Sequence, residues 1–363
     1  MRTYVCVVLT LAFLGFAGGN GLAETGVMVP KHECFFLKSL HFTTNGMKFW
    51  YGKEKGGLEL LTGVPYSKLD CRNCHVSGCD RCHRTQWGKR LSYTLKTAQN
   101  PNMCLQCHSK EKAMIKVDLK AKQEDVHLAK GMTCTDCHSQ REMHGDGVQY
   151  TSLKEPGAMD TSCKKCHNAV KPTYAHTVHE GKLDCNACHV RHEVSCTNCH
   201  FDHLIKTGER KAIPVNGWVF LMNYRGKVTS ANMQTFFVRP DKTFLMFAPK
   251  MGHSIMKKGR KCDDCHGTKT MHQVQKEKRL KLTWLEDGKV ANLKGVIPVA
   301  RGVKYECAYL DLKDGKWVPV KHPAEPIQQF VEFGEPLTKE QLEALAAHQE
   351  EPEPEVKPRT KAK

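Results

Sequence analysis

The chain has 363 residues, of which 55 are Lys or Arg and 38 are Asp or Glu, so its formal net charge is +17. It also contains 19 cysteines and 20 histidines. A basic excess is typical of proteins that bind nucleic acid or an anionic surface, but no basic run is interleaved with stacking aromatic residues. This pattern argues against a nucleic-acid-binding protein.

The N-terminus reads as a secretory signal peptide over residues 1–23. Arg2 precedes an apolar stretch at 5–19, and the small residues of GLA at 21–23 suit cleavage before Glu24. The alternative is an uncleaved membrane helix. No later stretch approaches the roughly 20 apolar residues of a spanning helix. We therefore expect an exported protein without a stable membrane span, periplasmic or extracellular, in an oxidising compartment.

An N-terminal arm (24–70) follows and contains His32, Cys34 and His41. Beyond it, every Cys-x-x-Cys pair is followed directly by His. The eight units are Cys71–Cys74–His75, Cys79–Cys82–His83, Cys104–Cys107–His108, Cys134–Cys137–His138, Cys163–Cys166–His167, Cys185–Cys188–His189, Cys196–Cys199–His200 and Cys262–Cys265–His266. Export makes disulfides one alternative, and Cys pairs make zinc another. Only haem c uses all three residues, two thiols for the porphyrin and an imidazole for the iron. The sequence therefore predicts eight covalently bound haem c groups.

The spacing of the motifs predicts that haems form the core of a multihaem domain (71–275). Residues 71–203 hold seven motifs, which leaves too little chain per cofactor for an ordinary side-chain core. We expect a mostly irregular and short α-helical fold there. Haem propionates also account for much of the Lys/Arg excess.

The C-terminal part differs in composition from the motif-rich part. Aromatic and β-branched runs at 216–224, 235–240 and 242–249 predict a β insertion (about 212–250). Segments 281–293 and 303–320, each with an Asp-Gly turn, predict a small β-rich unit (276–336) that packs with the insertion. Residues 337–349 read as a helix capped by Thr338 with Gln341 in a capping box, and 350–363 as a disordered tail.

The second axial ligand separates an electron relay from an enzyme, because a second His closes the iron to substrate. The candidate second ligands are His32, His41, His127, His144, His176, His179, His192, His203, His253 and His272, whereas His322 and His348 read as surface residues. His192 and His203 each follow a motif histidine by three residues, so we expect them to serve a neighbouring haem. A propionate or surface role, or methionine ligation, remains an alternative for each iron.

Two further hypotheses concern residues of the arm. His32 or His41 could ligate a haem of another subunit and link subunits into filaments. Cys34 and Cys307 are the mature cysteines outside the motifs, and we expect them to form a disulfide; two unpaired thiols are the alternative.

The segments VHLAKGMTCTDCHSQREMHGDG (126–147) and YAHTVHEGKLDCNACH (174–189) resemble the haem-binding core of octahaem tetrathionate reductases and hydroxylamine oxidoreductases. The resemblance covers roughly residues 100–203 and implies closely packed haems in parallel and perpendicular pairs. In the catalytic members it also implies one special haem, Lys-ligated or cross-linked to Tyr. No motif here has Lys in place of His, and no residue matches the special Lys or Tyr.

Two functions follow from these patterns. The favoured one is an electron-transfer conduit through mostly bis-His haems, exchanging electrons with cytochromes or quinol-linked donors. The alternative is an oxidoreductase that acts on a small nitrogen or sulfur compound at one open haem.

Overall fold

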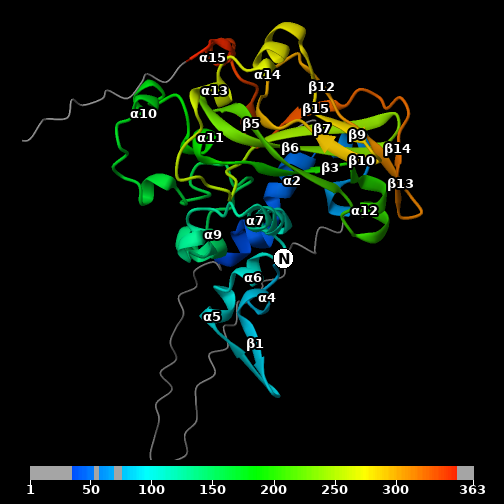
Figure 1. Ribbon diagram of the computed structural model, residues 1–363. Helices are drawn as coiled ribbons and strands as arrows, with labels where there is room; N and C mark the ends of the chain where they lie inside the picture. Colours follow the sequence, from blue (N-terminus) through cyan, green and yellow to red (C-terminus); the bar gives the residue numbers. More distant parts are fainter. Residues whose placement is uncertain (1–34, 53–56, 69–75, 350–363) are drawn as a thin grey trace, which may run out of the picture.

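The computed structural model describes residues 35–52, 57–68 and 76–349. Figure 1 shows a sheet-rich part above and a part made of short helices and loops below and to one side. Within the described ranges, no helix is long and apolar enough to cross a membrane. The expected signal peptide, Cys34, the first motif (71–75) and the expected tail lie outside these ranges.

The first half of the chain forms short helices, because caps and haem motifs interrupt it every few residues. The arm contributes α1 (Leu40–Thr43), α2 (Asn45–Tyr51) and α3 (Leu58–Thr62). After it come α4 (Asp80–His83), α5 (Leu95–Ala98), α6 (Pro101–Cys104), α7 (Ser109–Ala121), α8 (Cys134–Cys137), α9 (Gln140–His144), α10 (Tyr174–Val178) and α11 (Cys185–His189). One hairpin, β1 (Arg84–Trp87) with β2 (Arg90–Tyr93), projects below them (Figure 1). Helices this short are marginal alone, so tertiary contacts must hold them.

The second half of the chain builds one large sheet. Its centre is the antiparallel meander β5 (Ile213–Tyr224), β6 (Lys227–Arg239) and β7 (Lys242–Pro249). Strand β11 (Gly295–Pro298) pairs parallel with β5, and β15 (Ile327–Phe330) pairs parallel with β7. Three shorter strands also join the sheet: β3 (Glu193–Thr197), β4 (Cys199–His200) and β16 (Gly334–Glu335). The segments expected as a β insertion and as a separate C-terminal unit thus share one sheet.

The remaining elements surround this sheet. The strands are β8 (Arg279–Lys281), β9 (Thr283–Glu286), β10 (Lys289–Asn292), β12 (Lys304–Glu306), β13 (Leu310–Lys313) and β14 (Lys316–Pro319). The helices are α12 (Phe201–Thr207), α13 (Cys262–Cys265), α14 (Lys269–His272) and α15 (Lys339–Ala346). The Asp-Gly turns are confirmed: Asp287–Gly288 and Asp314–Gly315 have positive φ and close the hairpins β9–β10 and β13–β14. Thr338 and Gln341 form the expected capping box of α15.

Alternation along β5 fixes what covers each face of the sheet. Trp218, Phe220 and Met222 belong to a buried cluster with Tyr305 of β12, and the residues between them, Val219 and Leu221, belong to another. Successive strand residues point to opposite faces. The second cluster includes residues of α11, α14 and α15, namely Ala187, Met271, Leu342 and Leu345. This face therefore positions the motif helix α11.

Candidate metal centres formed by paired histidine rings

Six motif histidines lie ring to ring with a second histidine from elsewhere in the chain. Every pair contains one motif histidine and one of the candidate second ligands. The ring centroids are 6.3 Å apart for His108–His41, 6.0 Å for His83–His144, 6.0 Å for His167–His127, 6.1 Å for His138–His253, 6.2 Å for His189–His176 and 6.0 Å for His266–His179.

This separation suits two imidazoles that share one iron. A metal–imidazole bond is about 2.0 Å and a ring nitrogen lies roughly 1.2 Å from the ring centre, so the two centroids should lie about 6.4 Å apart. Rings in direct van der Waals contact could approach more closely. The six pairs therefore fit a metal held between two axial nitrogens.

Hydrogen bonds at the other ring nitrogen hold several of these rings in place. Among motif histidines, Nδ1 of His138 lies 2.7 Å from Glu142 Oε2, Nδ1 of His189 lies 3.1 Å from the Met256 carbonyl, and Nδ1 of His266 lies 2.8 Å from the Ala344 carbonyl. Among their partners, Nδ1 of His176 and His179 lie 2.8 Å from backbone carbonyls. When Nδ1 donates, Nε2 is left as the metal-binding atom, as is usual for ligating histidines.

Burial keeps several partner rings in the form that binds metal. It lowers the pKa of His41, His144 and His253 below the ordinary value, because it disfavours the charged imidazolium. Neighbouring histidines lower the pKa of these groups further. A neutral imidazole is the metal ligand, so these rings need lose no proton to coordinate iron near neutral pH.

The motifs of the paired histidines share one backbone shape. In five of them the histidine N–H donates to the carbonyl of the first cysteine, at 2.8–3.0 Å, and the sixth is the helix α11. This i to i+4 bond closes one helical turn. Residues i and i+3 share a face of such a turn, so both thiols can bond one porphyrin edge. The cysteines of all six motifs are at least partly exposed.

The thiols of successive motifs lie close to one another. Cys104 hydrogen-bonds with Cys134, and Cys185 with Cys163. Cys107 lies near enough to Cys82, Cys166 to Cys137, and Cys262 to Cys188 to raise the pKa of the second thiol of each pair, in addition to burial. The six motifs thus form one row in chain order. In Figure 1 the labelled motif helices of this row, α4, α6, α11 and α13, follow one another upward.

The described chain resumes beside the lower end of the row. Val76 donates its N–H to the His41 carbonyl at 3.1 Å. The motif at 71–75 lies outside the described residues, and only residues 76–78 separate it from Cys79 in the sequence.

Three expected second ligands are not brought against a motif histidine within the described ranges. Nε2 of buried His192 lies 2.8 Å from Asp118, and Nε2 of His203 lies 3.8 Å from Glu209. His272 is exposed at the end of α14. Cys71, Cys74, His75 and His32 lie outside the described residues. A role as second ligand therefore stays a prediction for His32, His192, His203 and His272.

The motif at Cys196, Cys199 and His200 differs from the other six described motifs. It lies on strands β3 and β4 instead of a helical turn, and Nε2 of His200 is 2.8 Å from Asp311 Oδ1. Cys196 and Cys199 pair with strands β5 and β6, and helix α12 begins only after His200.

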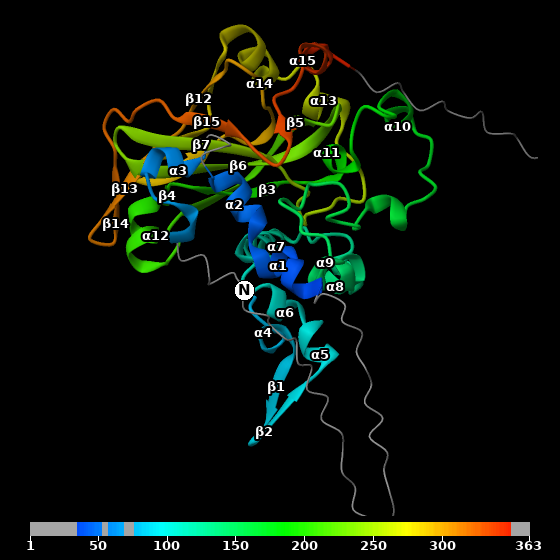
Figure 2. The same ribbon diagram turned by 180° about the vertical axis from the view of Figure 1, so that it is seen from behind.

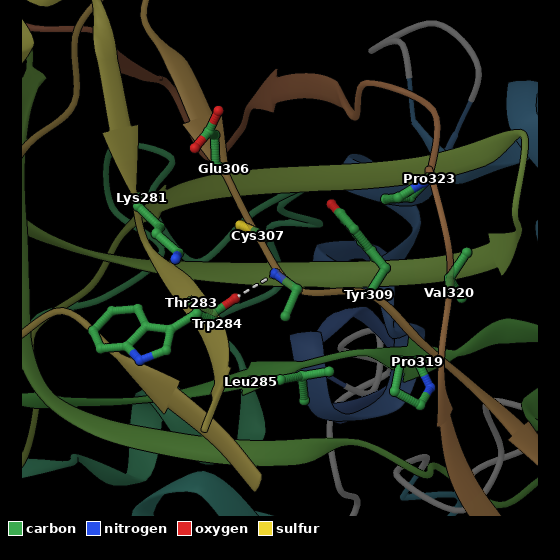
Figure 3. A pocket seen from close by; sticks show the side chains of 11 residues that line it. Lys281, Thr283, Trp284, Leu285, Glu306, Cys307, Tyr309, Pro319, Val320 and Pro323 are labelled. Atoms are coloured by element: carbon green, nitrogen blue, oxygen red, sulfur yellow. Dashed lines mark hydrogen bonds between the residues drawn. The ribbon is translucent and has the colours of Figure 1, made fainter. Parts of the chain in front are cut away.

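Cys307 lines a cavity of about 270 Å³ between the two C-terminal hairpins (Figure 3). The Ala308 N–H donates to Thr283 Oγ1 in its wall, at 2.8 Å. Burial raises the pKa of the Cys307 thiol to about 12, so the sulfur is held as a thiol. The expected disulfide to Cys34 stays a prediction, because Cys34 lies outside the described residues.

Sequence reasoning missed Glu142 as a supporting residue. Its buried carboxylate faces His138 and accepts hydrogen bonds from the N–H groups of Asp160 (2.8 Å) and Thr161 (2.6 Å). Its position four residues after His138 was a weak signal, because His138 precedes α9 and Glu142 lies in the first turn of that helix. Within the described ranges, no group of three or more His, Cys, Asp or Glu side chains could hold a bare metal ion.

Comparison with known proteins supports the c-type haem interpretation. The chain is 23% identical over 184 residues to cytochrome c-552 of Bacteroides fragilis, covering 47% of this chain and 37% of that protein. It is 28% identical over 144 residues to cytochrome c-552 of Haemophilus ducreyi, covering 36% of this chain and 29% of that protein. The chain thus spans well under half the length of these relatives. No family model and no solved structure matches. These distant relatives indicate a c-type cytochrome with covalently bound haem c.

Proposed function

We propose that this chain is an exported multihaem c-type cytochrome that passes single electrons along a row of closely spaced, mostly bis-His haems. The observation that carries the proposal is the set of six ring pairs, each joining one motif histidine to one histidine from elsewhere. Two axial imidazoles leave no open position for a substrate, which favours electron transfer over catalysis.

The chain's own residues supply the attachment and the ligand field. Haem c bound here supplies a one-electron iron couple. The two thiols of each motif would anchor the macrocycle, and the paired imidazoles would hold its iron. Acceptors such as Glu142 and the Ala344 carbonyl fix the ring orientation through Nδ1. Lys and Arg side chains offset the propionate charge.

The order of electron transfer follows the row of motifs. Because the two thiols of each motif would hold one porphyrin, neighbouring thiols would bring successive porphyrins close together. The relay would then run from the motif of His83 to the motif of His266 in chain order, with the motif of His75 next to it in the sequence. Redox proteins, either cytochromes or quinol-linked donors, are the proposed partners at its ends.

The sequence count of eight motifs sets the upper number of haems. An oxidoreductase acting on a small nitrogen or sulfur compound is the second candidate, and it needs an iron with one open position. The iron of His75, whose motif lies outside the described residues, is where that position would be sought. The likeness to octahaem reductases and oxidoreductases suggests this second candidate, but no residue of this chain matches their special Lys or Tyr.

Electron paramagnetic resonance of the oxidised protein separates the two candidates. The relay predicts low-spin signals alone, because every bis-His iron is low-spin. A stoichiometric high-spin signal, or one haem that binds cyanide or nitrite, would contradict the relay and support the oxidoreductase.

Self-association into filaments remains a proposal for the arm. His41 faces His108 of its own chain, so His32 is the arm histidine left for a link between subunits. Electron microscopy of the secreted protein tests this: filaments that a His32→Ala variant fails to form support the link, and discrete particles in the wild type count against it.

A further inference from the structure

The motif Cys196–Cys199–His200 has a backbone that the other described motifs lack. In five of those motifs the histidine N–H donates to the first cysteine, whereas the His200 N–H donates to the Lys211 carbonyl at 2.9 Å. Asn198, between the two cysteines, has φ +54 and interrupts the strand. Cys196 pairs with Pro214 of β5, and Cys199 with Phe236 of β6. The helical turn that presents both thiols to one porphyrin edge is therefore absent from this segment.

The second thiol of this motif is buried against apolar side chains. Cys199 is 2% exposed and belongs to a cluster with Tyr51, Phe201, Phe236 and Phe244. The cysteines of the other described motifs are half-buried or exposed. This cluster packs Tyr51 of the arm against Phe236 and Phe244 of the sheet. A porphyrin bonded to Cys199 would have to displace these side chains.

Both nitrogens of His200 already have partners within the chain. Nε2 donates to Asp311 Oδ1 at 2.8 Å, and Nδ1 accepts the His203 N–H at 3.2 Å. One neutral tautomer satisfies both bonds. The ring is 6% exposed and lies against Phe237 and Trp317. In the paired motif histidines whose Nδ1 is hydrogen-bonded, Nε2 is left to bind iron. In His200 it is Nε2 that is bonded, to the Asp311 carboxylate.

The motif also lies to one side of the row. Figure 2 places β4 and α12, which follows directly from His200, on the opposite side of the molecule from α11 and α13. Near its thiols lies Lys110 of α7. These thiols do not appear among the neighbouring thiols of the six paired motifs. A haem here would not continue the series of neighbouring thiols.

We infer that residues 196–200 are a structural segment of the sheet and carry no haem, so that the chain attaches seven haems instead of eight. His200 and Asp311 join β4 to the β13–β14 hairpin, and Cys199 fills the core between the arm and the sheet. On this inference Cys196, Cys199 and His200, which the sequence predicts as haem-binding residues, would hold no haem. It rests on the proposed function for the other seven motifs.

Mass spectrometry of protease fragments of the full, haem-loaded protein tests the inference. The fragment that contains Cys196 and Cys199 should carry no haem, and both thiols should react with iodoacetamide after reduction in denaturant. Fragments of the other motifs should carry haem. A haem on the 196–200 fragment overturns the inference but leaves the proposed function intact. Absence of haem from every fragment overturns the proposed function instead.

Matched variants give a second, independent readout. Haem per chain, measured as the pyridine haemochrome, should be unchanged in Cys196→Ser and should fall by one in Cys185→Ser with Cys188→Ser. Because Cys196 is only half-buried, its replacement by Ser should leave the fold intact, which replacement of Cys199 does not guarantee. Loss of one haem in Cys196→Ser contradicts the inference. So does a haem that stays bound in this variant through Cys199 alone.

Discussion

His83 and His144 lie nearly parallel, with ring planes 21° apart and centroids 6.0 Å apart, although one belongs to α4 and the other ends α9. The Ser139 side chain caps α9 by accepting the Glu142 N–H, and this cap fixes the helix that carries His144. The pair therefore depends on a local cap and on the contact of two segments that are distant in sequence.

Replacement of His144 by Ala should open one iron of the oxidised protein. Without the second imidazole, the haem attached by Cys79 and Cys82 should become high-spin, giving about one high-spin iron per chain, since a single axial His leaves the other position weakly held. Electron paramagnetic resonance measures the change. The matched control is His322→Ala, which removes an exposed ring expected at the surface and should leave the low-spin spectrum unaltered. A fully low-spin spectrum of His144→Ala would contradict the assigned pair.

Replacement of Glu142 by Gln should raise the reduction potential of the haem attached by Cys134 and Cys137. The carboxylate lies 2.7 Å from His138 Nδ1 and increases the electron density that the imidazole gives to the iron. A hydrogen bond to a charged group contributes on the order of 1–2 kcal/mol, and 1.4 kcal/mol equals about 59 mV for one electron, so we expect a shift of tens of millivolts.

Spectroelectrochemical titration measures this shift. One haem of the series should move upward while the others keep their potentials, and Glu155→Gln, remote from the ring pairs, provides the control. A downward shift, or an equal shift of every haem, would show that Glu142 does not act through His138.

Some of these features could be read from the sequence and others could not. The Cys-x-x-Cys-His spacing, the Asp287–Gly288 turn and the Thr338 cap are local patterns, and the structure has the turn and the cap where they were expected. The ring pairs are not local: His253 precedes Cys262 by nine residues yet faces His138. Likewise, the parallel pairing of Val296 with Val219 joins two β segments only through the tertiary fold.

The motif at 196–200 is a case in which a local sequence pattern does not determine the local conformation. Its three defining residues match those of the other motifs, but Val194 and Thr197 favour a strand, and β5 and β6 provide its partners. Tertiary pairing therefore decides the conformation of a segment whose motif alone predicts a helical turn.

The buried Glu332 should make stability fall as the pH rises. Burial raises the pKa of this carboxyl to about 7 from an ordinary value of 4.5, and Lys154 offsets part of the effect. Between these two values the folded state keeps the proton and the unfolded state loses it, so the contribution is full below pH 4.5 and is lost as the pH rises toward 7. At 1.36 kcal/mol for each pKa unit, the loss is about 3 kcal/mol at most.

Thermal unfolding at several pH values checks the Glu332 prediction. Glu332→Gln mimics the protonated carboxyl, so its melting temperature should fall less than that of the wild type between pH 5 and pH 8. Glu325→Gln alters an exposed carboxyl and should follow the wild type. Parallel curves for Glu332→Gln and the wild type would show that this group carries no pH-dependent stability.

Replacement of Asn232 by Ala should destabilise the sheet by about 2–4 kcal/mol, because it leaves several buried groups without partners. The Trp218 indole N–H donates to Ser195 Oγ at 2.8 Å, the Ser195 hydroxyl donates to Asn232 Oδ1, and Asn232 Nδ2 donates to the Val194 carbonyl at 2.8 Å. This chain of bonds links β3, β5 and β6, and all of its side chains are buried.

Urea unfolding followed by far-ultraviolet circular dichroism measures the Asn232 effect. The midpoint for Asn232→Ala should drop clearly below that of the wild type, whereas Asn102→Ala, on the exposed side of α6, should change it little. Ser195→Ala should give a smaller loss, because Asn232 keeps its bond to Val194. An Asn232→Ala midpoint equal to that of the wild type would mean that these bonds do not hold β3, and with it Cys196, in the sheet.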